Sequence, residues 1–221
     1  MNATGKYIIV PGPQRDYIVF NQRCRAWQHP YEYQGNGSTL ANAGCGVFSV
    51  CHAAQYLSGK TPDPEALADF SCQNGGRGDD GTDRPTLLAA MERAGLALKY
   101  GFSYAMDGLR NDTDTLYARL RIGDGALCNL RPGHIVALIG AREADGEKQV
   151  LVIDSYSESA DAKVIQQVRQ VLPGSEIVSA VRGPGGAVCG MQITYALYWA
   201  ALSTVRDFNL LTRLRPDAAA T

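Results

Sequence analysis

Helical periodicity dominates the first half of the chain. An apolar and largely uninterrupted run over residues 47–57 stops at Gly59, which predicts a buried helix that ends at a glycine. Three further helices are expected over residues 64–70, 85–94 and 112–122. The first of these starts with an Asp cap followed by Pro, and the other two carry apolar side chains on one face.

Strand patterns dominate the second half. Three runs rich in β-branched and apolar residues occupy positions 126–130, 134–140 and 149–154, and the last two are joined by a polar turn around Gly146. They predict a meander of antiparallel strands. Two short strands separated by prolines are also expected near the start of the chain, at residues 6–10 and 17–20. Helices first and sheet second predict the α+β class.

Other segments have weaker patterns. Residues 96–104 and 175–182 are expected to form strands, and residues 191–202 a buried strand that continues the sheet. That last run is apolar for about twelve residues, which is short of the ~20 that a membrane-spanning helix needs. A weak helix is expected over residues 162–170 and a turn over 183–186.

Two long loops separate the helices. Residues 21–37 lack periodicity but contain several aromatic residues, so they predict an ordered loop packed in front of the helix at 47–57. Residues 72–83 are rich in Gly and Asp and predict a mobile, solvated loop. We expect a single domain over residues 1–212 and a disordered tail over residues 213–221.

Composition excludes several functional classes. The chain has 221 residues, 45% of them hydrophobic, which is enough for one sizeable core. With 21 basic and 22 acidic residues the net charge is −1, so neither nucleic acid nor an anionic membrane is an expected partner. The short apolar run before Pro11 is too small for a signal peptide, which favours a cytoplasmic location. Nothing in the sequence indicates the oligomeric state.

The six cysteines have no metal-binding or disulfide pattern. They occur at positions 24, 45, 51, 72, 128 and 189, without a CxxC pair or a regular spacing. We therefore expect mostly free thiols, with no metal and no organic cofactor.

Cys45 is the candidate nucleophile. It lies between Gly44 and Gly46 at the expected start of the helix, where glycines permit close approach of other chain segments. The positive end of the helix dipole and the free N–H groups of the first turn favour a thiolate over a thiol. The alternative is a small buried residue at a tight turn, and only partners elsewhere in the chain can decide between the two.

Three histidines are available as a base. His52 follows Cys45 by seven residues, which places it roughly 10 Å along the helix axis and predicts a packing role. His29 lies in the aromatic loop, where packing is the simpler interpretation. His134 begins a strand directly after Gly133 and is the favoured base, although a histidine that merely satisfies a strand end is the alternative.

Asp154 is the expected partner of His134. If the strands at 134–139 and 150–153 are antiparallel neighbours, the start of the first and the end of the second meet. The Asp154 carboxylate then reaches the imidazole and fixes its tautomer and orientation.

These motifs together resemble a known family. The pattern comprises Gln22 followed by Trp27, Gly-Cys-Gly at 44–46, Pro-Gly-His-Ile-Val at 132–136 and Val-Ile-Asp-Ser-Tyr at 152–156. It is similar to the papain-like (clan CA) cysteine peptidases, specifically the branch of bacteriocin-processing, double-glycine leader peptidases. The resemblance implies a papain-like cysteine proteinase fold, in which the nucleophile helix packs on an antiparallel sheet.

The resemblance also implies roles for four residues. Cys45 would be the nucleophile, His134 the general base and acid, Asp154 the orienting carboxylate, and Gln22 the side-chain donor of the oxyanion hole. Gln34 lies closer to Cys45 in sequence and competes for the last role. The chain departs from the family pattern where Ser155, rather than Pro, follows the Asp.

The expected function is a cysteine peptidase that hydrolyses a peptide or amide bond in a peptide or protein substrate through a thioester at Cys45. A papain-fold acyltransferase or amidase with the same triad is an alternative, because an amine or thiol can replace water in the second step. A non-catalytic peptide-binding domain is a third possibility, but it would have no need of all four residues.

Overall fold

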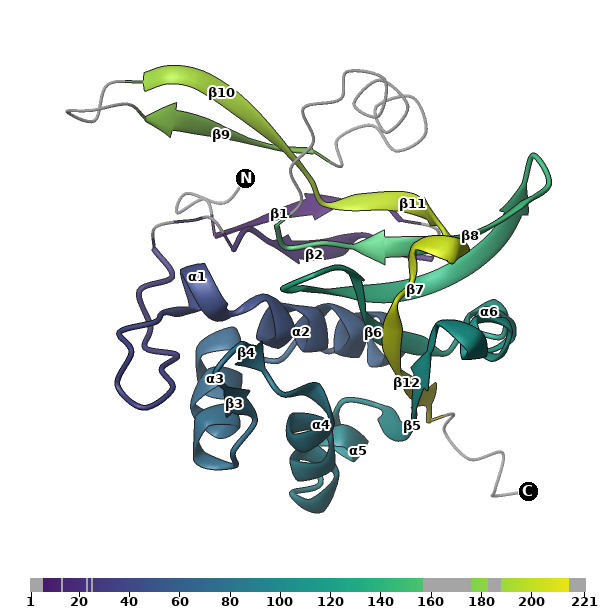
Figure 1. Cartoon of the computed structure of the whole chain (residues 1–221), viewed down its shortest axis with the longest axis horizontal. Coiled ribbons are helices and arrows are strands. Elements are labelled where there is room, and N and C mark those ends of the chain that lie inside the picture. The colour runs from purple at the N-terminus through teal and green to yellow at the C-terminus, as the bar shows by residue number, and fades with distance from the viewer. Residues whose placement is uncertain are drawn as a thin grey trace.

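A long central helix, α2, packs against an antiparallel sheet in the computed structural model of the chain (Figure 1). The structure describes residues 6–12, 14–22, 24, 26–156, 176–182 and 188–214. Helices and the sheet segregate along the chain, as the α+β class requires. In Figure 1 most helices lie below the strands, and α2 runs between the two layers.

The main sheet has six strands in the order β11-β8-β7-β6-β12-β5. All neighbours in it are antiparallel. The strands are β5 (Phe102–Leu109), β6 (Gly125–Arg131), β7 (His134–Ala144), β8 (Glu147–Ile153), β11 (Leu197–Ala201) and β12 (Asp207–Arg213). The expected meander of β6, β7 and β8 is therefore confirmed, and it forms the middle of the sheet.

Three strand pairs lie outside the main sheet. The pair β1 (Tyr7–Val10) and β2 (Tyr17–Phe20) was expected, and β2 contacts α2. The pair β9 (Glu176–Arg182) and β10 (Val188–Tyr195) forms a separate antiparallel ribbon, which Figure 1 shows extending above the N-terminal end of α2. The third pair is β3 (Arg77–Gly78) with β4 (Gly81–Thr82).

The structure contains four of the expected helices, α2, α3, α4 and α6, together with the short helices α1 and α5. They are α1 (Leu40–Ala43), α2 (Cys45–Ser58), α3 (Pro64–Gln73), α4 (Arg84–Arg93), α5 (Leu96–Lys99) and α6 (Thr113–Arg121). The Asp63 carboxylate accepts from the Ala66 N–H at the start of α3, as predicted. Asp83 caps α4 in the same way, which the sequence analysis did not anticipate. Gly59 ends α2 with a positive φ of 79°.

Both faces of the main sheet are buried. Alternate residues of β8, such as Leu151 and Ile153, belong to a core shared with α2, whereas Val150 and Val152 belong to a second core with Leu116 and other side chains of α6. Burial on both sides explains why these strands appear in the sequence as continuous apolar runs.

The aromatic loop at 21–37 packs as expected. Trp27 and Tyr31 are buried, and the Trp27 ring meets Phe48 of α2 edge-on at a centroid distance of 5.2 Å. Phe20 at the end of β2 also contacts both rings. The loop is thus fixed to the first turns of α2. The last residues of the loop lead into α1, a short helix that the sequence did not predict.

The prediction of a mobile, solvated loop over residues 72–83 is wrong. Helix α3 extends to Gln73, and the residues after it form the small β3–β4 hairpin, in which Arg77 and Thr82 are buried. The Arg77 guanidinium donates to the carbonyls of Tyr31 and Gly81, at 2.9 and 3.0 Å, and to that of Gly78. A buried cation therefore satisfies the backbone polar groups that would otherwise keep this segment in water.

Three boundaries also differ from the expectation. The strand expected at 96–104 begins with helix α5, because Gly95 (φ 71°) turns the chain into one more helical turn before β5. The strand expected at 191–202 is divided between β10 and β11, and only β11 joins the main sheet, beside β8. Arg213, expected in a disordered tail, is the last residue of β12, which lies between β5 and β6.

Some expectations are not tested. The helix at 162–170, the turn at 183–186 and residues 215–221 of the tail lie outside the described residues. The single domain over residues 1–212 and the cytoplasmic location stay predictions.

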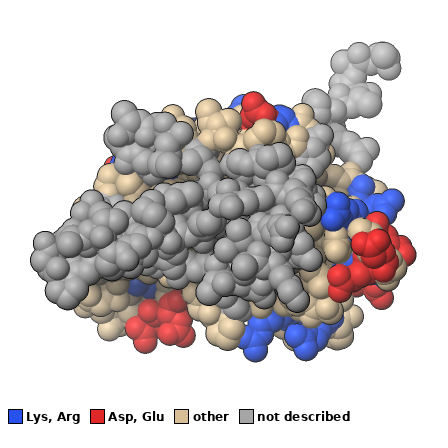
Figure 2. All heavy atoms as spheres, turned by 90° about the horizontal axis from the view of Figure 1, so that it is seen from above, with Lys and Arg blue, Asp and Glu red and all other residues tan. Residues whose placement is uncertain are grey.

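Within the part of the chain that the structure describes, no helix has the length and apolar character to cross a membrane. Figure 2 shows acidic and basic side chains side by side along the described margin of one face.

The two glycines around Cys45 are required by close contacts. A Cβ at Gly44 would overlap the Leu40 carbonyl oxygen, and a Cβ at Gly46 would overlap the Thr82 side chain of β4. Thr82 is held there by its hydroxyl, which lies 2.8 Å from the Tyr31 hydroxyl. The β3–β4 hairpin therefore packs closely against the first turn of α2.

Gly46→Ala is expected to destabilise the protein by about 1–3 kcal/mol, because the added methyl group forces Thr82 and its hairpin away from α2. Urea unfolding measures the change. Gly140→Ala is the matched control, since a Cβ there has its nearest neighbour, Leu151 Cβ, at an ordinary 3.8 Å. Equal stability of the two variants would contradict a close contact between Gly46 and Thr82.

Candidate active site

Cys45 is the first residue of α2 and is 9% exposed. Its backbone N–H belongs to the first helical turn, whose donors the helix itself does not use. Ser49, one turn later, ties this end of the helix to the sheet, because its hydroxyl bonds both the Cys45 carbonyl at 2.7 Å and the Ile135 carbonyl at 2.9 Å. The start of α2 and the start of β7 are thereby joined.

Two tight turns bring His134 and Asp154 together. Gly133 (φ 69°) closes the turn between β6 and β7, and Asp145 and Gly146, both at positive φ, close the turn between β7 and β8. The start of β7 and the end of β8 consequently meet. His134 Nε2 lies 2.6 Å from Asp154 Oδ1, and both side chains are buried. The predicted proximity of these two residues is confirmed.

The Asp154 carboxylate has further donors. Its Oδ1 also accepts from the Tyr156 N–H at 2.8 Å, and its Oδ2 accepts from the Tyr198 hydroxyl at 3.0 Å. The Asp154 N–H bonds the Ala196 carbonyl at 2.9 Å, which fixes the backbone as well. The Tyr156 ring packs edge-on against His134 at a centroid distance of 5.7 Å. Both oxygens of a carboxylate that is only 1% exposed therefore have hydrogen-bond partners.

Cys45 and His134 shift each other's pKa. Burial raises the pKa of the Cys45 thiol, but the hydrogen bond and positive charge of His134, with backbone hydrogen bonds from Ile135 and Gly46, outweigh it and lower the pKa. Burial lowers the pKa of His134, but the bond to Asp154, its charge and the Cys45 sulfur raise it to about 9. Since Nε2 faces Asp154, Nδ1 is the ring atom available to Cys45.

Three other thiols are shifted in the opposite direction. Burial raises the pKa of Cys51 and Cys128, which have no exposed surface, and that of Cys72, which is exposed on α3. Cys45, Cys51, Cys72 and Cys128 form no disulfide. Of the thiols for which the direction is resolved, Cys45 alone has a lowered pKa, so the environment that activates it is local.

Gln22 joins the site through Ser155, the residue after Asp154. The Gln22 N–H bonds the Ser155 carbonyl at 3.0 Å, and the Ser155 hydroxyl donates to Gln22 Oε1 at 3.1 Å. With Oε1 turned to Ser155, Nε2 is the end of the amide that can donate elsewhere. Gln34, the competitor, is exposed and lies at a positive φ of 50° in a turn of the aromatic loop.

His52 has a structural role that helps to place Gln22. It is fully buried, stacks on Phe20, and its Nε2 accepts from the Phe20 N–H at 3.0 Å. Burial lowers the pKa of His52 to about 3, so it stays neutral and keeps that acceptor. Two residues after Phe20 comes Gln22, and between them the Asn21 carbonyl accepts from Trp27 Nε1 at 3.0 Å. The predicted packing role is thus confirmed.

His29 is engaged elsewhere. Its Nε2 lies 2.7 Å from Asp69 Oδ1 of α3, and its Nδ1 lies 3.9 Å from a Glu65 oxygen. These contacts belong to the surface of the aromatic loop, and His29 is therefore a packing residue as expected.

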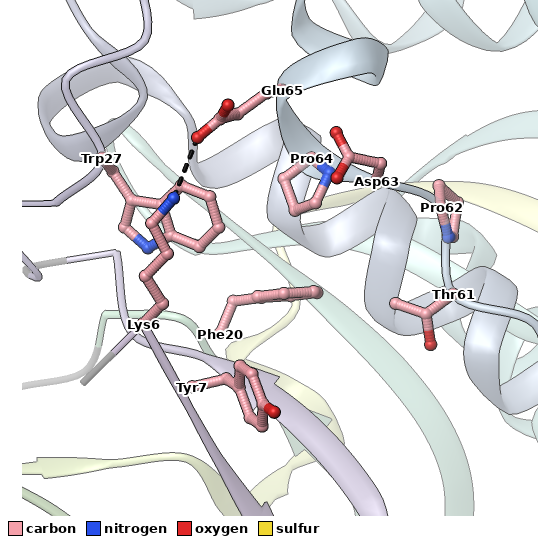
Figure 3. Close-up of a pocket in the computed structure, with 9 residues that line it drawn as sticks. All are labelled: Lys6, Tyr7, Phe20, Trp27, Thr61, Pro62, Asp63, Pro64 and Glu65. Carbon is pink, nitrogen blue, oxygen red and sulfur yellow. Dashed lines mark hydrogen bonds and ion pairs between the residues drawn. The ribbon is translucent and has the colours of Figure 1, made fainter. Parts of the chain in front are cut away.

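A separate pocket of about 400 Å³ lies near the start of the chain (Figure 3). Phe20, Trp27 and Pro64 are among its walls, and Figure 3 shows Lys6 reaching over the Trp27 ring toward Glu65, with which it forms an ion pair at 2.9 Å. Cys45, His134 and Asp154 are not part of its lining. The pocket is thus distinct from the site at the start of α2.

Comparison with known protein families and with curated proteins finds no match to this chain. The residues described by the structure also contain no group of three or more His, Cys, Asp or Glu side chains placed to hold a metal ion. The function is therefore inferred from the geometry of the site itself.

The sequence predicted the four candidate residues but not the contacts that hold them in place. Ser49, Tyr198 and the contact between Ser155 and Gln22 were not anticipated. Ser155 stands beside a candidate residue, so the sequence contained a signal for it. Tyr198 lies 44 residues from Asp154 and reaches it only because β11 pairs with β8, for which no local pattern exists.

Iodoacetamide at pH 6 is expected to alkylate Cys45 ahead of the other five cysteines. A thiol of ordinary pKa is only about 0.3% ionised at that pH, whereas the lowered pKa of Cys45 raises its thiolate fraction. Peptide mass spectrometry measures the order of labelling. Cys72, which is exposed but not activated, is the internal control. Labelling of Cys72 before Cys45 would contradict the activated thiolate, as would an unchanged Cys45 rate in His134→Ala.

Proposed function

We propose that this protein is a cysteine peptidase that hydrolyses a peptide or amide bond through a thioester at Cys45. The observation that supports it most strongly is the connected set of Cys45, His134 and Asp154, in which the pKa of the thiol is lowered and that of the imidazole is raised. A thiolate and an imidazolium that coexist near neutral pH are what a cysteine nucleophile requires.

Each residue has a defined part in the proposed reaction. The Cys45 sulfur attacks the carbonyl carbon, and the carbon–nitrogen bond breaks as His134 gives its proton to the leaving amine. Water then attacks the thioester while His134 takes a proton from it, and the acid product leaves as the carbon–sulfur bond breaks. Asp154 keeps the imidazole in one orientation throughout.

Gln22 is the proposed side-chain donor of the oxyanion hole. Its Oε1 is engaged by Ser155, and the remaining Nε2 donor would act with the Cys45 N–H on the negative charge that develops on the carbonyl oxygen. Two donors, one from the side chain and one from the backbone, fit the arrangement that the family resemblance implies. On this basis we infer membership of the papain-like cysteine peptidases, in the leader peptidase branch.

Two other functions make different predictions. An acyltransferase would use the same thioester but transfer the acyl group to an amine, so products would change when an amine acceptor is added. A non-catalytic binding domain would gain nothing from a thiol of lowered pKa beside an imidazole of raised pKa. Assays of hydrolysis with and without the added amine separate the first two functions.

Cys45→Ala and His134→Ala are each expected to abolish nearly all cleavage of an internally quenched peptide library, because nucleophile and base act as a unit. Asp154→Asn keeps an oxygen for the imidazole and should retain measurable activity. Rates are compared per folded molecule. His29→Ala is the control and should leave the rate unchanged, because the His29 imidazole bonds Asp69 of α3 and not the site. Activity that survives in His134→Ala would exclude His134 as the base.

Gln22→Ala is expected to lower kcat by roughly 10²-fold while leaving KM and Cys45 alkylation nearly unchanged, because an oxyanion donor acts on charge present only in the transition state. Gln34→Ala is the matched control, and its kcat should not change because Gln34 is exposed in a turn. Steady-state kinetics and melting temperatures distinguish the possibilities. A Gln22→Ala enzyme that is less stable but turns over at the normal rate would show that Gln22 is only structural.

A further inference from the structure

Tyr198 touches the site from a strand that takes no other part in it. Its hydroxyl donates to Asp154 Oδ2 at 3.0 Å, on the opposite side of the carboxylate from His134. Tyr198 lies in β11 opposite Val152, two positions before Asp154. Side chains two positions apart on a strand project from the same face, so the pairing of β11 with β8 places the hydroxyl beside the carboxylate.

The two carboxylate oxygens of Asp154 have different hydrogen-bond partners. Oδ1 accepts from His134 and from the Tyr156 N–H, whereas among the described residues Oδ2 accepts only from Tyr198. A carboxylate can rotate about its bond to Cβ, and that rotation would exchange the two oxygens or tilt Oδ1 away from the imidazole. A donor on Oδ2 opposes that rotation. It also supplies a hydrogen-bond partner to Oδ2, the buried oxygen that neither His134 nor the Tyr156 N–H reaches.

We propose that Tyr198 is a positioning residue that fixes the Asp154 carboxylate for its hydrogen bond to His134. This inference rests on the proposed function, since it concerns the same Cys45, His134 and Asp154 set. In the described contacts Tyr198 reaches the site through Asp154 and not through the thiol or the imidazole. Strand β11 consequently contributes to reactivity at Cys45 from the edge of the sheet.

The test uses Cys45 alkylation, which needs no substrate. In Tyr198→Phe the ring and its packing remain and only the hydroxyl is lost. We expect the rate constant for alkylation of Cys45 by iodoacetamide at pH 6 to fall by about 10-fold per folded molecule, because one hydrogen bond to a buried charge is removed. Tyr104→Phe is the matched control, since its hydroxyl also bonds a carboxylate, Asp107, but on β5. That variant should react at the wild-type rate.

A double-mutant cycle distinguishes positioning from general stabilisation. If Tyr198 acts through Asp154, Tyr198→Phe should have no further effect on the alkylation rate in an Asp154→Ala background. The same loss in both backgrounds, or an unchanged rate in the single variant, would overturn the inference. Failure of the proposed function has a different signature, in which Cys45 of the unmodified protein is no more reactive than Cys72.

Discussion

The hydrogen bond between His134 and Asp154 is the interaction on which the proposed chemistry depends. At 2.6 Å between two buried side chains, it keeps positive charge on an imidazole that burial alone would hold neutral. That charge in turn lowers the pKa of the Cys45 thiol against the opposing effect of its own burial. The Asp154 carboxylate therefore favours the thiolate form of Cys45 through the His134 imidazole, without contacting the sulfur itself.

The fold holds Cys45, His134 and Asp154 close to one another. Two hairpin turns bring His134 beside Asp154. Ser49 bonds the start of α2 to the start of β7, and the β3–β4 hairpin packs against Gly46. The first of these contacts joins two strand ends, and the other two join the start of α2 to strands. The site consequently lies at the boundary between the helical and the sheet layers.

The sequence predicted the site better than it predicted the scaffold around it. The positions of Cys45, His134 and Asp154 could be predicted because short-range signals, namely paired glycines, a Pro-Gly turn and a simple hairpin, determine where each one lies. The hairpin at residues 77–82 was missed because its burial depends on the bond from Arg77 to the Tyr31 carbonyl of the distant aromatic loop. Strand β12 alternates polar and apolar residues and could have been recognised, but its position between β5 and β6 is a long-range choice that no local pattern encodes.

The most direct test is an NMR titration of the His134 ring in the protein and in Cys45→Ser. Our account predicts that His134 titrates with a pKa of about 9 and that this value falls in Cys45→Ser, because the partner thiolate is lost. A pKa near the ordinary ~6.5 in both proteins would contradict the thiolate–imidazolium pair and the function built on it.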